Sequence, residues 1–407
     1  MLKAYILRMR RITTSGDYFG AIDGVRLIAI LLVFVQHLHE RVVRFGAGLY
    51  PQWNSESTFA TGLMGVHVFF ALSGFILYRV LEKPFREGGK PNLSKYYLRR
   101  LTRLEPPYII IATLIFLALV LGVSHSQGKF LRQGGQAFWQ SYLATITYTH
   151  VLIFGTPPSV NPPGWTLEIE VQFYLLAPLF VLLLHKIKPI HRRVLGILTV
   201  VVVWNWLFAV VMPLDDHRRL VHSPRYQMSL LSQLPYFLVG FAVLELRRLF
   251  ASARPSIWVD IAAGLGLAGA VILQNPLTPL PAAVWQCFCI GLFLYGALAG
   301  GWWGRILGAG LVASLGGMCY TLYLIHLPLM EMLVRFTGHV GCGIPYLLYY
   351  LIQFCIVIPI VFVVASVFFL IIEQPCMRPN WPRELAHWVR RAFGRKELQS
   401  TPNVAKS

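Results

Sequence analysis

Two ionisable side chains stand in one apolar stretch near the N-terminus, at the spacing of a shared helix face. Within residues 22–40, IDGVRLIAILLVFVQHLHE, Arg26 and His37 are 11 residues apart. At about 100° per residue this is about three turns, so both side chains leave the same face, about 16 Å apart along the axis. An imidazole can act as a general base, and a guanidinium can stabilise a developing oxyanion. Because both groups are costly to insert into a bilayer, together they indicate a functional site.

Three more ionisable side chains are predicted at the depth of His37, each in a different apolar span. With the orientation derived below, His67, Glu170 and His326 fall with His37 in one layer, about 8 Å inside the outer surface. An interhelical hydrogen bond is the simpler interpretation of any single membrane histidine. Four ionisable groups in one layer favour a site over that alternative.

Only one of two neighbouring carboxylates can belong to this layer. Glu168 and Glu170 are two residues apart, which corresponds to about 200° around a helix, so they point in different directions. We favour Glu170 because Leu167 and Tyr174 share its face and form a stripe directed at the bundle.

A second cluster is basic and is predicted to be cytoplasmic. In YYLRRLTRLEPPY, Arg99, Arg100 and Arg103 immediately precede an apolar span. Guanidinium forks suit phosphates, and the start of a helix adds N–H donors and a favourable dipole. The alternative is simple anchoring of the topology by positive charge. Upstream, Ser73 and Gly74 lie in the inner half of their span, where small residues permit close helix approach or a narrow passage.

The composition and the distribution of charge indicate an all-α, polytopic membrane protein. The chain has 407 residues, of which 56% are hydrophobic and 13% charged. Apolar runs long enough to cross about 30 Å predict about ten transmembrane helices. They cover roughly residues 22–41, 61–80, 105–123, 165–184, 195–213, 230–247, 257–273, 283–299, 309–331 and 347–372. With the N-terminus inside, 27 of the 36 Lys and Arg fall in inside segments and 8 outside, which predicts two cytoplasmic termini.

Several classes of function are disfavoured by the same sequence. The net charge of +19 is accounted for by topology, and no nucleic-acid-binding motif accompanies it. The six cysteines form no CxxC pair and no Cys/His zinc pattern. We therefore expect small buried thiols, no disulfide framework, no metal and no bound cofactor.

The chain is predicted to form one transmembrane domain over residues 1–375, followed by a short basic cytoplasmic tail at 376–407. The longest external segment, 124–164, contains an amphipathic stretch at 136–154. This stretch is either a short or re-entrant helix or an additional span. We place it outside because an extra span would reverse the charge sorting of every later segment.

Six motifs occur in the order found in the acyltransferase 3 family of integral membrane O-acyltransferases, which this chain resembles. They comprise Arg26 and His37 after Asp23 and Gly24; Phe69, Phe70, Ser73, Gly74 and Phe75; Arg99, Arg100 and Arg103 with Pro106 and Tyr108; Trp165, Leu167, Glu170, Phe173 and Tyr174, with Thr166 in a serine position; Tyr320, Tyr323, Leu324 and His326; and Glu373 with Pro375. Two features depart from the family pattern. His67 stands where an acidic residue is common, and the family's SGNH hydrolase-like domain is absent, which predicts a stand-alone form.

The resemblance implies transfer of an acyl group, most often acetyl, from acyl-CoA to a hydroxyl of a carbohydrate or glycolipid acceptor. It also implies a multi-pass protein of the bacterial inner membrane. In our hypothesis His37 is the general base, oriented by Glu170 or another partner, while Arg26 stabilises the oxyanion or the leaving thiolate. The acyl-CoA would bind Arg99, Arg100 and Arg103 and pass Ser73 and Gly74. The supporting residues are His67, Trp165, Tyr174, Tyr320, Tyr323 and His326.

Two alternatives stay open at this point. An acyl-His37 intermediate would use the same residues as general-base catalysis. A proton-coupled transporter or flippase of glycan or lipid-linked substrates would use a His/Glu layer for proton relay, although no internal repeat supports it. Neither the acceptor, the acyl chain nor the oligomeric state follows from the sequence.

Overall fold

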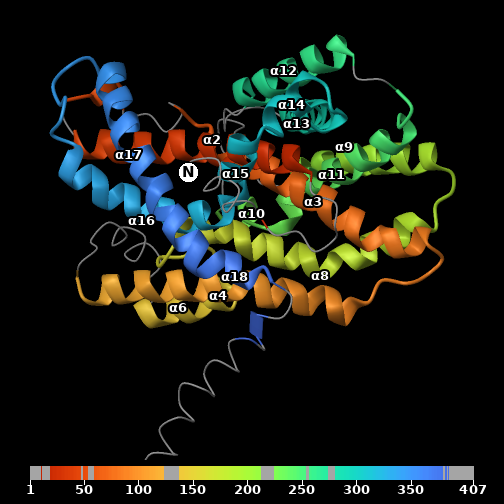
Figure 1. The fold of residues 1–407 in the computed structure, drawn as a ribbon, viewed down its shortest axis with the longest axis horizontal. Helices are drawn as coiled ribbons and strands as arrows, with labels where there is room; N and C mark the ends of the chain where they lie inside the picture. Colours follow the sequence, from red (N-terminus) through yellow and green to blue (C-terminus); the bar gives the residue numbers. More distant parts are fainter. Residues whose placement is uncertain are drawn as a thin grey trace, which may run out of the picture.

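The computed structural model describes residues 11, 19–46, 49–53, 59–122, 137–211, 224–253, 256–273, 280–378, 381–382 and 384. Within these residues the chain is helical and contains no strand (Figure 1). The elements are α2 (Gly20–Phe45), η1 (Pro51–Trp53), α3 (Gly62–Arg86), α4 (Leu93–Val120), α6 (Phe138–Ile146), α7 (His150–Phe154), η2 (Pro162–Gly164), α8 (Trp165–His185), α9 (Ile190–Val211), α10 (Pro224–Gln227), α11 (Leu230–Leu249), α12 (Ile257–Ile272), α13 (Leu280–Ala299), α14 (Trp302–Leu307), α15 (Gly310–Gly317), α16 (Cys319–Thr337), α17 (Tyr346–Phe368), η3 (Phe369–Glu373) and α18 (Gln374–Cys376).

Each of the ten predicted spans corresponds to helical structure, and the described part of the chain has the architecture of a multi-pass membrane protein. Among the described residues, eight helices are long and apolar enough to cross a membrane. The ninth span is broken, because α15 and α16 meet at an angle of 64°. The predicted span at 257–273 is a helix of only 16 residues, or about 24 Å. The cytoplasmic location of both termini stays a prediction.

The centre of the bundle is formed by α2, α3 and α11. In their most apolar windows 67%, 67% and 72% of residues are buried, compared with 17% in α9 and 33% in α17. The outer helices instead expose large apolar side chains, among them Leu114, Leu195 and Val363, as expected for surfaces that face lipid. The helix that carries Arg26 and His37 is therefore enclosed by the others.

The described part of the stretch at 136–154 forms two short helices, α6 packed against α4 and α7 packed against α8. At nine and five residues, α6 and α7 are about 14 and 8 Å long and cannot span a bilayer. Helix α6 lies beside α4 (Figure 1), where the Tyr108 hydroxyl donates to the Thr145 carbonyl at 3.0 Å. Tyr108 is 12 residues before the end of α4 at Val120, so α6 ends about 18 Å from that end.

Helix α8 begins close to the point where α6 ends. A Cβ added to Gly164, the residue before α8, would lie 3.6 Å from the Tyr108 hydroxyl oxygen. The side chain of Glu168 caps α7 by accepting hydrogen bonds from the backbone N–H groups of Val151 and Leu152 at 2.9 and 3.1 Å. Helix α8 therefore starts beside Tyr108, about 18 Å short of the end of α4 at Val120, and α6 lies along the remaining part of α4.

The break between α15 and α16 places both pieces against α2. An added Cβ at Gly316 would overlap the carbonyl oxygen of Asp23, so only glycine allows α15 to approach α2 this closely. After the turn at Met318, α16 continues along the other half of α2. The two pieces thereby contact α2 near Asp23 and near His37.

Candidate active site

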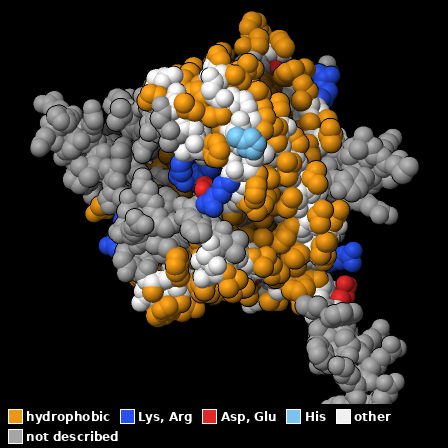
Figure 2. All heavy atoms as spheres, turned by 90° about the vertical axis from the view of Figure 1, so that its left-hand side faces the viewer, with side chains coloured by type: hydrophobic (Ala, Val, Ile, Leu, Met, Phe, Trp, Pro, Cys, Tyr) orange, Lys and Arg blue, Asp and Glu red, His pale blue; other side chains and the backbone are white. Residues whose placement is uncertain are grey.

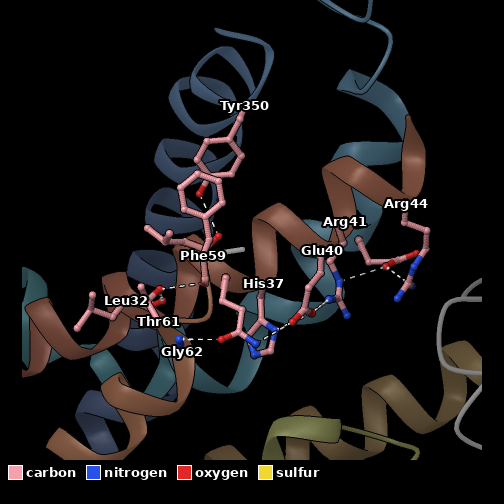
Figure 3. Close-up of polar contacts among 12 residues, drawn as sticks. Leu32, His37, Glu40, Arg41, Arg44, Phe59, Thr61, Gly62 and Tyr350 are labelled. Atoms are coloured by element: carbon pink, nitrogen blue, oxygen red, sulfur yellow. Dashed lines mark hydrogen bonds and ion pairs between the residues drawn. The ribbon is translucent and has the colours of Figure 1, made fainter. Parts of the chain in front are cut away.

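The C-terminal half of α2, which the predicted orientation places on the outer side, carries a hydrogen-bonded cluster around His37 (Figure 3). The ring Nδ1 of His37 lies 3.1 Å from Oε2 of Glu40, one turn later on the same helix. The Arg41 guanidinium donates to the same oxygen at 2.5 Å, and the Gln36 amide donates to Oε1 of Glu40 at 3.0 Å. The side-chain Oε1 of Gln36 accepts a hydrogen bond from the backbone N–H of Gly62 at 2.8 Å. This bond connects the cluster to the start of α3.

This geometry indicates which ring nitrogen of His37 carries a proton. An ionised carboxylate can only accept hydrogen bonds, so Nδ1 of His37 carries the proton. In the neutral ring Nε2 therefore presents a lone pair, which is the form that a general base requires. The His37 side chain is 23% exposed, so a substrate hydroxyl can reach it from the neighbouring space.

A chain of ion pairs extends the cluster to α16. Glu331 lies 3.4 Å from Arg41 and 3.5 Å from Arg44, and Arg335 lies 3.6 Å from its other oxygen. The face at the left of Figure 1 is hollowed at its centre, where basic and acidic side chains gather within a largely apolar surface (Figure 2). These ion pairs connect α2 and α16 on the C-terminal side of His37.

His326 on α16 is the second imidazole of the outer site. Its ring centroid lies 5.3 Å from that of His37 and 5.3 Å from that of Phe34, and the side chain is fully buried. Its Nδ1 lies 3.1 and 2.7 Å from the carbonyl oxygens of Leu322 and Tyr323. Its Nε2 has no hydrogen-bond partner among the described residues.

The inner half of α2 carries a separate cluster around Arg26. The guanidinium donates to Asp23, one turn earlier, at 2.5 Å, and Arg11 lies 3.8 Å from the same carboxylate oxygen. Glu170 accepts hydrogen bonds from the Ser73 hydroxyl at 2.5 Å and from the Tyr174 hydroxyl. Arg26 also interacts electrostatically with Glu170, so Glu170 belongs to the inner cluster.

The predicted four-residue layer is therefore wrong in part. Only His37 and His326 come together, and the carboxylate partner of His37 is Glu40 rather than Glu170. Glu170 is displaced because α8 begins about 18 Å short of the end of α4, so five residues into α8 is further inside than the sequence predicted. His67 stacks on Tyr236 of α11 with ring centroids 3.6 Å apart and is buried there, away from His37.

The three predicted donor arginines lie six to ten residues after α4 begins at Leu93, so the free N–H groups of the helix start, which the sequence analysis assigned to this site, are not beside them. The Arg100 guanidinium lies over the ring of Tyr174 at 4.9 Å, whereas Arg99 is exposed. Arg103 reaches inward and interacts electrostatically with Glu373 and Arg26, but its Nε has no hydrogen-bond partner among the described residues.

The inner cluster brings three arginines together, of which Arg103 makes no ion pair within the described residues. Burial, followed by repulsion from Arg103 and Arg26, lowers the pKa of the Arg11 guanidinium well below its ordinary value. An anionic group brought to this place would relieve the repulsion between the three arginines. The cluster therefore has the electrostatics of a site for a phosphate or a thiolate.

The remaining predicted residues have structural contacts. An added Cβ at Gly74 would overlap the Phe237 carbonyl oxygen, so this glycine allows close approach of α3 and α11. Tyr320 donates to the Leu104 carbonyl at 2.8 Å, and Tyr323 donates to the Pro163 carbonyl at 2.5 Å. These bonds join α16 to α4 and to the segment before α8. Trp165, half-buried, is the first residue of α8.

Two functional residues are absent from the sequence-based hypothesis. Glu40 and Asp23 are each three residues from His37 and Arg26 respectively, a spacing at which helical side chains meet. That spacing was a signal for both contacts. Within the described parts of the chain, no group of three or more His, Cys, Asp and Glu side chains has an arrangement suited to a metal ion.

Comparison with known proteins identifies the family to which the chain belongs. The family model for the acyltransferase 3 type of acyltransferase domain matches residues 19–368. The chain belongs to the acyltransferase 3 family. The resemblance seen in the six motifs is thereby confirmed.

Curated proteins that are similar to the chain include the O-acetyltransferase OatA of Staphylococcus aureus, from strains NCTC 8325 / PS 47 and COL. Each is 27% identical over 181 residues, which cover 43% of this chain. The matched region spans only 27% of each relative's own length. No solved structure matches the chain.

Proposed function

We propose that the protein is a membrane O-acyltransferase, which moves an acyl group from acyl-CoA to a hydroxyl of a carbohydrate-type acceptor. Membership of the acyltransferase 3 family supports acyl transfer, and the name of the S. aureus relatives supports acetyl as the group and oxygen as its destination. The donor, the class of acceptor and a location in a bacterial inner membrane are part of the proposal.

The observation that carries the proposal is the His37–Glu40 pair. Its 3.1 Å contact leaves the Nε2 lone pair of a partly exposed imidazole unpaired. A scaffold has no use for an oriented base of this kind, and the pair lies on the same helix face as Arg26. In the proposed reaction His37 takes the acceptor's hydroxyl proton while that oxygen attacks the thioester carbonyl. The C–S bond then breaks, and the thiolate leaves with the proton from His37.

The inner cluster is assigned to the donor. Arg103 and Arg100 would hold phosphates of acyl-CoA, since neither makes an ion pair within the described residues. The Ser73–Glu170–Tyr174 group lies next to Arg26 and would line the path of the pantetheine arm. Because Arg26 and His37 are about 16 Å apart, the thioester must extend past Arg26 toward the outer cluster.

The proposal is tested with His37→Gln in cells that express the protein. We expect the variant to reach the membrane at the normal level and to leave envelope glycans unacylated by mass spectrometry. His39→Gln is the matched control, because His39 lies two residues away and bonds Tyr346 instead; it should retain acylation. Full acylation by His37→Gln would overturn the proposed role of this base. If the wild-type protein adds no acyl group to any envelope glycan, the proposed acceptor class is wrong.

A further inference from the structure

We infer that His326 is a positioning residue for the base, and that its Nε2 accepts a hydrogen bond from the proton that His37 acquires during acyl transfer. The inference rests on the proposed function above. It concerns a side chain to which neither the family match nor the relatives assign a role.

The tautomer of His326 follows from its backbone contacts. Both neighbours of Nδ1 are carbonyl oxygens, at 3.1 Å in Leu322 and 2.7 Å in Tyr323. Carbonyl oxygens only accept hydrogen bonds, so Nδ1 carries the proton and Nε2 of the neutral ring carries a lone pair. Burial next to Phe34 disfavours a charged ring and keeps His326 in this form.

The lone pair of His326 is an unsatisfied acceptor in an apolar setting. Nε2 is buried and has no hydrogen-bond partner within the described residues. Burying a hydrogen-bond acceptor without a partner is unfavourable. A buried acceptor that stays unpaired in the folded protein therefore calls for a functional explanation. The side chain in ring contact that can gain a proton is His37, with its centroid 5.3 Å away.

The two imidazoles therefore differ in what they can do. Neutral His37 donates through Nδ1 to Glu40 and uses Nε2 as a base. Once Nε2 has taken the hydroxyl proton, the ring is cationic and needs an acceptor for the new N–H until the thiolate removes it. His326 supplies that acceptor by a small rotation of either ring and takes up no proton itself, so the overall reaction is unchanged. Glu40 and His326 thus support the imidazolium from opposite nitrogens.

The fully buried ring also excludes a direct contact with substrate in this arrangement. His326 is 0% exposed, whereas the His37 side chain is 23% exposed. The effect of removing the acceptor should therefore appear in kcat and leave both KM values unchanged. A residue that binds the acceptor sugar would instead raise KM for that substrate.

The test compares His326→Phe with His326→Gln in membranes that contain the protein and its natural acceptors, with acetyl-CoA as donor. Phenylalanine retains a ring and removes the acceptor, whereas glutamine places a neutral amide oxygen near the position of Nε2. Initial rates of CoA thiol release should fall about 10- to 100-fold in kcat for His326→Phe, the effect of losing a hydrogen bond to a charged group. His326→Gln should recover at least part of that loss. Thermal unfolding of the purified variants verifies that both are folded.

Several results would overturn the inference. These are an unchanged kcat in folded His326→Phe, a loss confined to KM, or equal losses in the phenylalanine and glutamine variants. If wild-type membranes release no thiol above a His37→Gln background, the proposed function fails instead. If the wild type is active and His326→Phe equals it, only the role of His326 fails.

Discussion

Removal of the charge on Glu40 is the sharpest test of how the base is oriented. In Glu40→Gln one carboxylate oxygen becomes an amide nitrogen, and the 3.1 Å contact to Nδ1 of His37 loses its ionic partner. The new amide can donate to Nδ1, which would place the ring proton on Nε2 and block the base. The variant should fold, because Arg41 retains Glu331 at 3.4 Å.

The magnitude follows from the type of contact that is lost. Hydrogen bonds to charged groups contribute about 1.5–3 kcal/mol, and each 1.36 kcal/mol corresponds to about tenfold in rate. We therefore expect kcat to fall about 10- to 150-fold. A general base contributes about 10²- to 10⁴-fold, so Glu40→Gln should remain more active than His37→Gln.

The assay is the initial rate of CoA thiol release by membranes supplied with acetyl-CoA, normalised to the amount of folded protein. Glu331→Gln is the matched control, since Glu331 belongs to the same charge network and bonds Arg41 rather than His37; its rate should stay within about twofold of wild type. In the double variant of Glu40 and His37 the losses should not add, because both residues act as one unit. Wild-type kcat in Glu40→Gln, or additive losses, would refute the orienting role.

Four further outcomes are expected. Arg103→Gln should raise KM for acetyl-CoA about tenfold through the loss of one phosphate contact, with kcat unchanged in the thiol-release assay. An unchanged KM would mean that Arg103 only anchors the membrane topology by its positive charge. Gly74→Ala should lower the midpoint of thermal unfolding strongly, because its Cβ overlaps the Phe237 carbonyl oxygen, whereas Gly196→Ala, with open space around it, should stabilise α9 slightly. Glu245→Leu should destabilise the fold by about 3–5 kcal/mol in denaturant unfolding, because Arg193 loses its buried partner and Arg248 loses one of two, each at 2.9 Å; no loss would mean that these pairs contribute nothing net. A cysteine placed at His339 in a cysteine-free background should react with an impermeant maleimide in intact cells, and labelling only after lysis would reverse the predicted orientation.

The helical content and the approximate position of each span could be predicted because hydrophobic runs are local. The run at 22–41, for example, lies within α2, which extends over Gly20–Phe45. The pairing of Arg26 with Asp23 and of His37 with Glu40 was equally local, because i,i+3 spacing brings helical side chains together. These contacts were available from the sequence, although the hypothesis looked for a partner on another helix.

The depth of Glu170 could not be predicted in the same way. Hydropathy locates the start of α8 but does not reveal that α6, rather than α8, lies along the C-terminal part of α4. The position of α8 depends on long-range contacts such as Tyr323 with the Pro163 carbonyl. Likewise, His67 was predicted to lie beside His37, but its stacking on Tyr236 depends on how α3 and α11 rotate about their close contact. Tertiary packing determines both outcomes.

The break at Met318 has a consequence for biogenesis. Helix α15 has eight residues, or about 12 Å, so it cannot enter a bilayer as a stable independent span. Its glycine-dependent contact with the backbone at Asp23 shows which surface receives it. Because α2 is synthesised first, it is already present when this late segment emerges. Helix α2 therefore serves as the surface on which α15 and α16 assemble, and the imidazole pair exists only after α16 has docked.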